Sequence, residues 1–252
     1  MVGEFSNKVG VVTGGSRGIG REIAVELVRS GAQTVIVSSS ADNLAIAAKT
    51  IASAGLAPVT VAADLRTLEG CQQVFDSVRE KFNRCDILIC SAGATRAGNF
   101  TELPDQAWIC VRMCRLFWPL LKAAQGSIVN IGGGAARSPG ADFSIGASVN
   151  AAMGNFSKAI SQLGKRDGVN VNVIHPGATE TERFYQLLEQ RSKASGKSVE
   201  QLKQEATAKD GLRRLGKPSD ISALVLFLCS EKARHIQGTA IAVDGGSTVG
   251  YY

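Results

Sequence analysis

The chain has 252 residues, of which 44% are hydrophobic and 20% charged, and no apolar run approaches the roughly 20 residues of a membrane span. Its net charge of +6 comes from basic residues interleaved with acidic ones, without the basic block or aromatic–basic repeat typical of nucleic-acid-binding proteins. The composition therefore excludes a membrane partner, argues against a nucleic-acid partner, and is ordinary for a globular protein.

The first predicted strand, Val9–Val12, leads into a glycine-rich turn. Residues 13–20 of this turn read TGGSRGIG and open an amphipathic helix predicted over Ile19–Ser30. Glycines let the backbone turn tightly and approach a pyrophosphate, which the free N–H groups and positive dipole end of the next helix stabilise. This strand, turn and helix together predict a dinucleotide-binding site.

Strands and helices continue to alternate after this unit. The next predicted strands are Thr34–Val37, Val59–Ala62 and Ile87–Cys90, with helices over Leu44–Ala54 and Leu68–Phe82 between them. Alternation of this kind predicts βαβ units, and hence a parallel sheet with helices on both faces. No repeat, linker or composition break marks a second domain, so residues 1–252 are expected to form one α/β domain.

Five motifs, in chain order, resemble those of the short-chain dehydrogenase/reductase family. The first is the glycine spacing Thr-Gly-x-x-x-Gly-x-Gly. The others are Ile87–Gly93, similar to the family's Asn-Asn-Ala-Gly motif with both Asn replaced, Ser127–Ile131, Asn172–Gly177 with its Pro-Gly turn, and Ile241–Gly246. The resemblance covers essentially the whole chain. It implies a doubly wound Rossmann-type sheet of about seven strands, a nicotinamide cofactor and oxidoreductase activity.

The second strand and the glycine turn favour NADP(H) over NAD(H). An enzyme that selects NAD usually has Asp or Glu at the end of this strand, where this chain has Ser38 and Ser39. Arg17 matches a family position that often contacts the 2′-phosphate, and its planar fork suits phosphate oxygens. The resemblance implies these cofactor-binding residues: Gly14, Ser16, Arg17, Gly18, Ile19, Gly20, Ser38, Ser39, Asp64, Leu65, Ala92, Gly93, Asn150, Pro176, Gly177, Thr179 and Thr181.

The family's catalytic residues are replaced in this chain. Members use a Ser after the fifth strand and a Tyr-x-x-x-Lys on the next helix, where the Tyr gives a proton to the alkoxide that hydride transfer leaves. Alignment with the family places Gly133 at the Ser position, Gly146 at the Tyr position and Asn150 at the Lys position, and a register one residue earlier places Ile145 and Val149 at the last two. The usual acid is absent in any register, because no tyrosine precedes Tyr185.

Substitutes for these groups lie nearby in the sequence. The catalytic candidates are Asn150, Ser148, Ser144, His175 and Tyr185. The amide could bind the nicotinamide ribose, the two hydroxyls could donate hydrogen bonds, and the histidine titrates in a useful range. Each also has a structural interpretation, as a core histidine or a surface serine or tyrosine.

The loop after the fifth strand contributes a different kind of candidate. Its Arg137 and Asp142 could bind an anionic or polar substrate, although an exposed loop pair is the plainer interpretation. Lys158, two turns beyond Asn150, is expected to point elsewhere.

Two segments depart from the regular alternation. Thr181–Pro218 is polar and charged, and by the resemblance it is a substrate lid over about residues 181–218. Trp108–Pro119 is two to three helical turns shorter than the family's long helix, which often packs against a second subunit. The family implies a small-molecule substrate and a homodimer or homotetramer, in which the closing Tyr251 and Tyr252 could pack on a neighbouring subunit.

The cysteines and the start of the chain indicate a cytoplasmic protein. Six cysteines without a Cys-x-x-Cys pair read as reduced thiols, and Met1–Lys8 lacks a signal pattern. Cys110 and Cys114 share a helix face without a His partner, so they are interpreted as packing residues and no metal site is predicted.

Several function classes fit these residues. The favoured one is a divergent NADP-dependent oxidoreductase acting on a carbonyl or alcohol, with substitute groups or a water relay. A catalytically silent cofactor-binding or sensor protein and a non-redox lyase or dehydratase on the same fold remain open. Gly14–Gly18 also satisfies the Gly-x-Ser-x-Gly elbow of a hydrolase, but Gly20 and the later motifs have no place in that interpretation.

Overall fold

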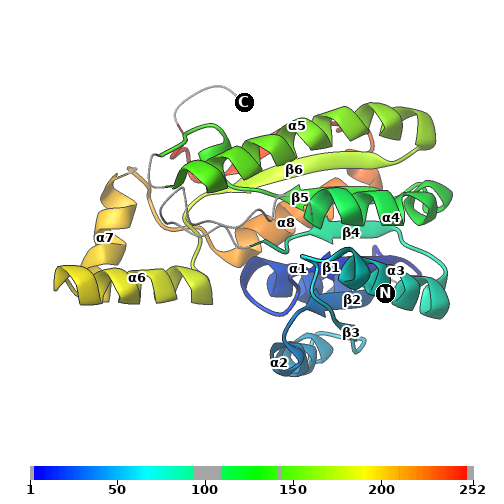
Figure 1. Cartoon of the computed structure of the whole chain (residues 1–252), viewed down its shortest axis with the longest axis horizontal. Helices are drawn as coiled ribbons and strands as arrows, with labels where there is room; N and C mark the ends of the chain where they lie inside the picture. The colour runs from blue at the N-terminus through cyan, green and yellow to red at the C-terminus, as the bar shows by residue number, and fades with distance from the viewer. Residues whose placement is uncertain (1–2, 94–108, 141–142, 210, 249–252) are drawn as a thin grey trace.

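The computed structural model describes residues 3–93, 109–140, 143–209 and 211–248. Seven parallel strands in this part of the chain form one sheet in the order β3-β2-β1-β4-β5-β6-β7 (Figure 1). The strands are β1 (Val9–Thr13), β2 (Gln33–Ser38), β3 (Val59–Ala62), β4 (Ile87–Cys90), β5 (Ser127–Ile131), β6 (Asn170–Pro176) and β7 (Ala240–Val243). The predicted doubly wound parallel sheet is confirmed, and the strand order reverses between β1 and β4.

Helices cover both faces of this sheet (Figure 1). One face carries α1 (Gly18–Arg29), α2 (Ala41–Ala52) and α8 (Pro218–Cys229), and the other carries α3 (Leu68–Phe82), α4 (Ile109–Ala124) and α5 (Ser144–Asp167). The start of α2 corrects the prediction of a helix from Leu44: the hydroxyl of Ser40 accepts a hydrogen bond from the Asn43 N–H and begins the helix one turn earlier.

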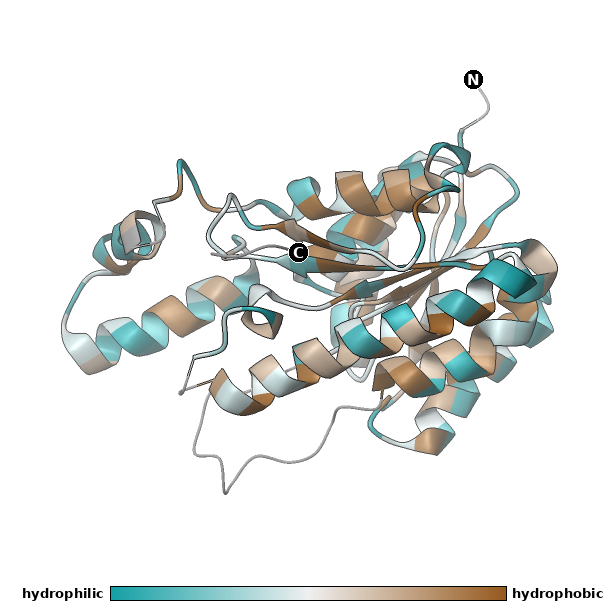
Figure 2. Cartoon of the chain, turned by 90° about the horizontal axis from the view of Figure 1, so that it is seen from above, coloured by the Kyte–Doolittle hydropathy of each residue, from teal (hydrophilic) through white to brown (hydrophobic). Residues whose placement is uncertain are grey.

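Two apolar cores lie against the two faces of the sheet. Val11 and Leu88 face the core under α3 and α4, whereas their neighbours Val12 and Ile89 face the core under α1 and α8. Successive side chains of a strand point to opposite faces, so a strand buried on both faces reads as a continuous apolar run. Figure 2 shows the strands as mostly hydrophobic, with hydrophobic and hydrophilic stretches alternating along the helices that cover them.

A buried carboxylate joins the amino ends of the central strands. Asp86, 3% exposed, accepts the N–H of Val9 at 2.9 Å and two hydrogen bonds from the Arg84 guanidinium at 2.7 Å, and Lys8 Nζ lies 3.3 Å away. The backbone carbonyl of Asp86 also accepts the N–H of Ser127. The carboxylate of Asp86 therefore binds the start of β1, and its backbone carbonyl binds the start of β5, at the end of the sheet opposite to the glycine turn.

The segment predicted as a lid forms two further helices, α6 (Glu182–Ser195) and α7 (Val199–Lys209). They extend from the carboxyl end of the sheet instead of covering one of its faces (Figures 1 and 2). Short 3₁₀ helices, η2 (Gly134–Ala136) and η4 (Glu231–Ala233), follow β5 and α8. No helix in the described ranges is both long enough and apolar enough to cross a membrane.

Some predictions fall outside the described residues. They are those on Trp108, where the shortened helix was expected to begin, and on Asp142, Tyr251 and Tyr252. The described part of α4 runs for 16 residues from Ile109.

Candidate functional site

The glycine turn between β1 and α1 leaves no room for side chains at two positions. Gly14 has a φ of +68°, and a Cβ there would lie 2.9 Å from the carbonyl oxygen of Ser91. A Cβ on Gly20 would lie 2.9 Å from the carbonyl carbon of Gly14 and closer still to its oxygen. The turn therefore packs backbone against backbone, which brings the first N–H groups of α1 to the carboxyl end of the sheet.

Thr13 connects this turn to the end of β4. Its hydroxyl oxygen accepts the N–H groups of Ser91 at 3.1 Å and Ala92 at 3.0 Å, and the hydroxyl donates to the Ile89 carbonyl. Gly93 follows on the surface. The predicted cofactor residues at 92 and 93 thus lie beside the glycine turn.

The end of β2 presents hydroxyls and no acid. Ser38 Oγ accepts the N–H of Ser40 at 3.3 Å, whereas the neighbouring Ser39 is exposed. Arg17, also exposed, is the residue before the first turn of α1. In the described part of the chain it forms no ion pair, and its side chain makes no capping hydrogen bond.

Asp64, after β3, has a partner that the sequence did not indicate. Its carboxylate accepts hydrogen bonds from Arg66 Nε at 2.8 Å and Nη2 at 2.6 Å, and these bonds lower the pKa of Asp64 to about 2. The carboxylate is therefore ionised at any physiological pH. Leu65 beside it is buried.

Glu182, at the start of α6, is a site residue that sequence reasoning missed. Its Oε2 accepts the N–H of Gly18 at 3.1 Å, and its Oε1 lies 2.5 Å from Arg21 Nη2. Burial would raise the pKa of Glu182, but backbone hydrogen bonds and the charge of Arg21 lower it, so the group is a carboxylate. An anion thus already lies at the amino end of α1, where the helix dipole stabilises negative charge.

The loop after β6 carries the remaining predicted cofactor residues. The N–H of Gly177, next to Pro176, donates to the Val243 carbonyl at 3.1 Å, and the Thr179 hydroxyl donates to the Gly177 carbonyl at 2.9 Å. Thr181 caps α6 by accepting the Phe184 N–H at 3.2 Å. A Cβ on Gly18 would lie 3.3 Å from the Thr181 methyl group, so this loop contacts the glycine turn.

Ser16 and Ile19 complete the predicted cofactor set, and both belong to the glycine turn. Ser16 is 5% exposed and Ile19 is half-buried.

The position aligned with the family's Tyr is filled by a different ring. A Cβ on Gly146 would lie 2.9 Å from Phe143 Cδ1 and closer to the far side of the ring. A Cβ on Gly133 would lie 3.0 Å from Asn150 Nδ2. Positions 133 and 150 therefore lie next to each other, while Phe143 takes the space in which a side chain from position 146 would begin.

His175 and Asn150 line one cavity of about 580 Å³ between α5, β6, β7 and η2. Its other lining residues are Ala136, Arg137, Ala151, Gly154, Asn155, Lys158, Val173, Gly238, Thr239 and Ala240. His175 is 1% exposed, and its Nδ1 accepts the Gly133 N–H at 3.1 Å, which leaves the proton of the neutral ring on Nε2. Burial and then the charge of Arg137 lower the pKa of His175 below its usual value.

Lys158 corrects one prediction. It was expected to point away from Asn150, yet both side chains line this cavity. Eight residues span a little over two helical turns, which separates the two side chains by only about 80° around α5. The cavity extends along α5, so both the Asn150 and the Lys158 side chains line it.

The other catalytic candidates do not line the cavity. Ser144 and Ser148 are exposed on α5, and the Ser148 hydroxyl donates to the Ser144 carbonyl at 3.0 Å. The Tyr185 hydroxyl donates to Glu180 at 3.0 Å, and Lys203 Nζ lies 3.5 Å from it. The structure thus brings together Asn150 and His175, with Arg137 beside them, and leaves the two serines and the tyrosine elsewhere.

Comparison with known proteins decides the family. A family model described as enoyl-(acyl carrier protein) reductase matches residues 14–248. The short-chain dehydrogenase/reductase FrzI of a Cladobotryum species is 31% identical over 250 residues, which cover 95% of each chain. The chain belongs to the short-chain dehydrogenase/reductase family.

Other members of the short-chain dehydrogenase/reductase family are similar along their whole length. The NADPH-dependent reductase BacG of Bacillus subtilis (strain 168) is 28% identical over 255 residues, which cover 96% of this chain and 98% of BacG. The crystal structure of L-sorbose reductase from Gluconobacter frateurii, complexed with NADPH and L-sorbose, superposes with a TM-score of 0.93 at 30% identity over 100% of both chains. The chain thus has an oxidoreductase fold with NADPH-bound structural relatives.

Proposed function

We propose that this protein binds NADP(H) and acts as an oxidoreductase on a carbonyl or alcohol substrate that is not yet identified. The observation that carries the proposal is the anion site at the amino end of α1, where the Glu182 carboxylate accepts the Gly18 N–H. Gly14 and Gly20 have no side chains, so a bound group can approach the backbone of the turn closely. These residues fit a pyrophosphate, which needs N–H donors at a helix terminus.

The choice of NADP(H) over NAD(H) rests on charge. Ser38 and Ser39 at the end of β2 leave no carboxylate to repel a 2′-phosphate, and Arg17 is exposed at the start of α1. An Arg fork can pair with two phosphate oxygens. The NADPH complex of the similar L-sorbose reductase and the NADPH dependence of BacG support the same choice.

Bound NADPH would supply a hydride, so the chain must orient the accepting oxygen and deliver a proton to it. Asn150 Nδ2 and His175 Nε2 are N–H donors on the same cavity, and we assign them the orientation of that oxygen or of a water beside it. The lowered pKa of His175 keeps its ring neutral at pH 7. Neither group replaces a tyrosine acid, so we expect turnover to be slower by about 10²–10⁴-fold than with an intact acid.

The proposal extends to the organisation of the chain. Residues 1–252 would form one cofactor-binding domain, with residues 181–218 as a lid over the substrate. Contacts of Thr181 and Glu182 with the glycine turn support a lid that responds to the cofactor. Assembly as a homodimer or homotetramer follows from family membership alone.

Titration with NADPH and NADH, followed by nicotinamide fluorescence, tests the cofactor assignment. Arg17→Ala should weaken NADPH binding by about 10- to 100-fold, since a hydrogen bond to a charged group contributes about 1.5–3 kcal/mol. NADH binding should hardly change, because NADH lacks the 2′-phosphate.

The matched control for this titration is Arg29→Ala, which removes an exposed arginine from the opposite end of α1. It should leave both affinities unchanged. Equal losses of NADPH and NADH binding with Arg17→Ala would contradict the assignment of Arg17, and no binding of either nucleotide to the wild type would contradict the proposed function.

Glu182→Gln should raise the affinity for NADPH about two- to fivefold. The cofactor phosphates must share the amino end of α1 with the Glu182 carboxylate, and a charge at a helix terminus contributes about 0.3–1 kcal/mol. Fluorescence titration at low ionic strength measures the change. The control Glu189→Gln removes an exposed carboxylate from α6, the helix that also carries Glu182, and should leave the NADPH affinity unchanged. A weaker NADPH affinity with Glu182→Gln would show that the Glu182 carboxylate does not compete with the cofactor.

A catalytically silent cofactor-binding protein is the second candidate, and one observation favours it. Position 146, aligned with the family's Tyr, is a glycine, and Phe143 lies where a side chain from this position would begin. Single-turnover oxidation of bound NADPH with a panel of aldehydes and ketones separates the two candidates. Oxidation with any carbonyl supports the oxidoreductase, and unchanged NADPH with every carbonyl supports the silent protein.

A further inference from the structure

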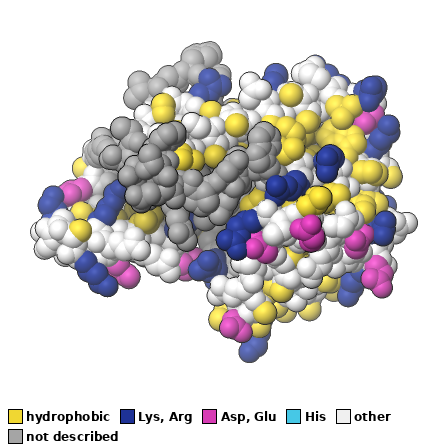
Figure 3. Space-filling model, viewed as in Figure 1, with side chains coloured by type: hydrophobic (Ala, Val, Ile, Leu, Met, Phe, Trp, Pro, Cys, Tyr) yellow, Lys and Arg dark blue, Asp and Glu magenta, His cyan; other side chains and the backbone are white. Residues whose placement is uncertain are grey.

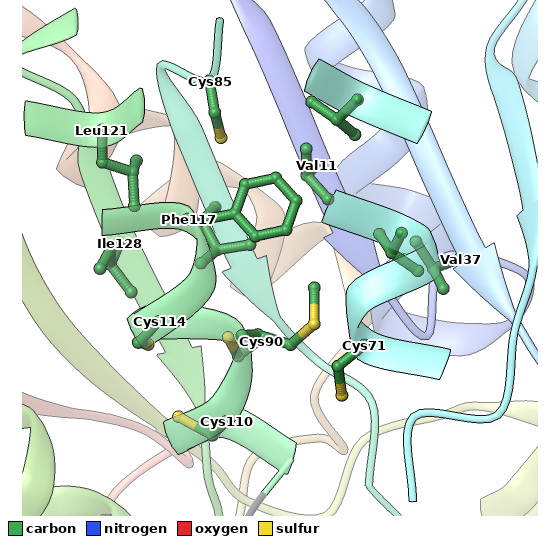
Figure 4. Close-up of a cluster of buried hydrophobic side chains, with 14 of the residues drawn as sticks. Val11, Val37, Cys71, Cys85, Cys90, Cys110, Cys114, Phe117, Leu121 and Ile128 are labelled. Carbon is green, nitrogen blue, oxygen red and sulfur yellow. The ribbon is translucent and has the colours of Figure 1, made fainter. Parts of the chain in front are cut away.

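Three cysteine sulfurs meet in the core under α4. Cys90 ends β4, and Cys110 and Cys114 lie one turn apart on α4. Their Sγ atoms all lie within 4.8 Å of one another, and the residues are 2%, 5% and 1% exposed. Figure 4 shows the three cysteine side chains close together, with the apolar side chains of Phe117 and Ile128 above them in the view. The sequence indicated only the pair on the helix, since Cys90 joins them through the fold.

These thiols differ from two other buried cysteines in their partners. Cys71 donates to the Leu65 carbonyl at 3.3 Å and Cys85 to the Ile87 carbonyl at 3.5 Å. In the cluster, Cys114 Sγ lies 4.0 Å from Asn130 Oδ1, and the sulfurs otherwise face one another. Hydrogen bonds from the other two thiols lower the pKa of Cys110, and hydrogen bonding and burial raise the pKa of Cys90. The first proton is therefore lost more readily than the next.

The spacing suits a single central atom with three sulfur ligands. Sulfurs bound at about 2.3 Å in a tetrahedral site lie about 3.8 Å apart, so small side-chain rotations would suffice here. In the described part of the chain, the cluster of ligand-type side chains contains these three cysteines and no histidine or carboxylate. The donor set is thus purely soft and three-coordinate.

The net charge of the complex indicates which element the three thiolates can bind in an apolar core. A divalent zinc ion with three thiolates would leave one negative charge in an apolar core, and a monovalent copper ion would leave two. Burying such a charge without a partner is costly. Arsenous acid reacts with three thiols to form three As–S bonds and three water molecules, because each hydroxide leaves with one thiol proton. No oxidant or reductant is needed, and the product is neutral.

We propose that Cys90, Cys110 and Cys114 form a binding site for one trivalent arsenic or antimony atom. The three bonds would join the end of β4 to α4. Ser91 and Ala92 follow Cys90 directly, and their N–H groups donate to the Thr13 hydroxyl. The cysteine site is therefore connected to the glycine turn through these two residues.

The test is incubation of the full chain with arsenous acid in a phosphine reductant, which offers no competing thiol. We expect one arsenic atom per chain in the intact-protein mass, with the mass of one arsenic added and three protons lost. Arsenic X-ray absorption should show three sulfur neighbours. A higher Tm should accompany the adduct.

Cys90→Ala, Cys110→Ala and Cys114→Ala should each abolish the adduct under conditions that load the wild type fully. Cys71→Ala, which removes a neighbouring buried thiol, should load as the wild type does. An adduct that persists in all three variants, or one that disappears in Cys71→Ala, would overturn the proposal. The sulfur count in the wild type decides the matter if a variant does not fold: fewer than three sulfur neighbours, or no adduct, also overturns it.

Discussion

Replacing Asp86 with Ala is expected to lower the free energy of unfolding by about 3 kcal/mol. The substitution removes a 3%-exposed carboxylate and leaves the Val9 N–H and the Arg84 guanidinium without their partner. Breaking a buried ion pair from one side costs about 3–5 kcal/mol, and partial exposure of the two cations places this case at the lower end. Urea unfolding followed by circular dichroism measures the change.

The control for this measurement is Asp64→Ala, because Asp64 pairs with an arginine two residues away as Asp86 does, but at the surface. It should leave the urea midpoint almost unchanged. Burial would raise the pKa of Asp86, but hydrogen bonds from Arg84 and Val9 hold it below its ordinary value. Its contribution is thus present above about pH 4 and is lost as the pH falls through the folded-state pKa. If the difference in free energy of unfolding between the wild type and Asp86→Ala stayed constant as the pH is lowered, this role would be contradicted.

Gly20→Ala is expected to abolish detectable NADPH binding and to lower the free energy of unfolding by about 1–3 kcal/mol. The new methyl group would lie against the carbonyl of Gly14, whose atoms belong to the backbone and cannot rotate away. The start of α1 must then move from the turn, which removes the N–H donors from their place. Fluorescence titration and urea unfolding measure the two effects.

Gly140→Ala is the matched control, because a Cβ there would meet nothing within 4 Å. It should change neither affinity nor stability by a measurable amount. NADPH binding by Gly20→Ala at wild-type affinity would show that the phosphates bind elsewhere.

Local patterns were sufficient to predict β1 to β4, whereas β5 to β7 were expected from the resemblance to the family. Strands β1 and β4 are short, mostly apolar runs that are buried throughout, and the glycine turn has the backbone contacts that its spacing implies. The start positions of helices were harder to predict. A single capping hydroxyl, such as that of Ser40, can add one turn to the start of a helix. Sequence therefore predicts where an element lies better than where it begins.

The candidate site was predictable only where its residues are close in sequence. The contact of Glu182 with Gly18 joins residues 164 positions apart, and no local pattern marks it. The meeting of Cys90 with Cys110 and Cys114 likewise depends on how β4 packs under α4. Lys158 was placed wrongly because the length of the cavity along α5 is a property of the packed helix and sheet.

The contact of Phe143 with Gly146 couples two positions of this chain. Phe143 lies where a side chain from position 146 would begin, so a larger residue at position 146 requires the ring to move. A design that introduces a tyrosine at position 146 is therefore best made together with a smaller residue at position 143.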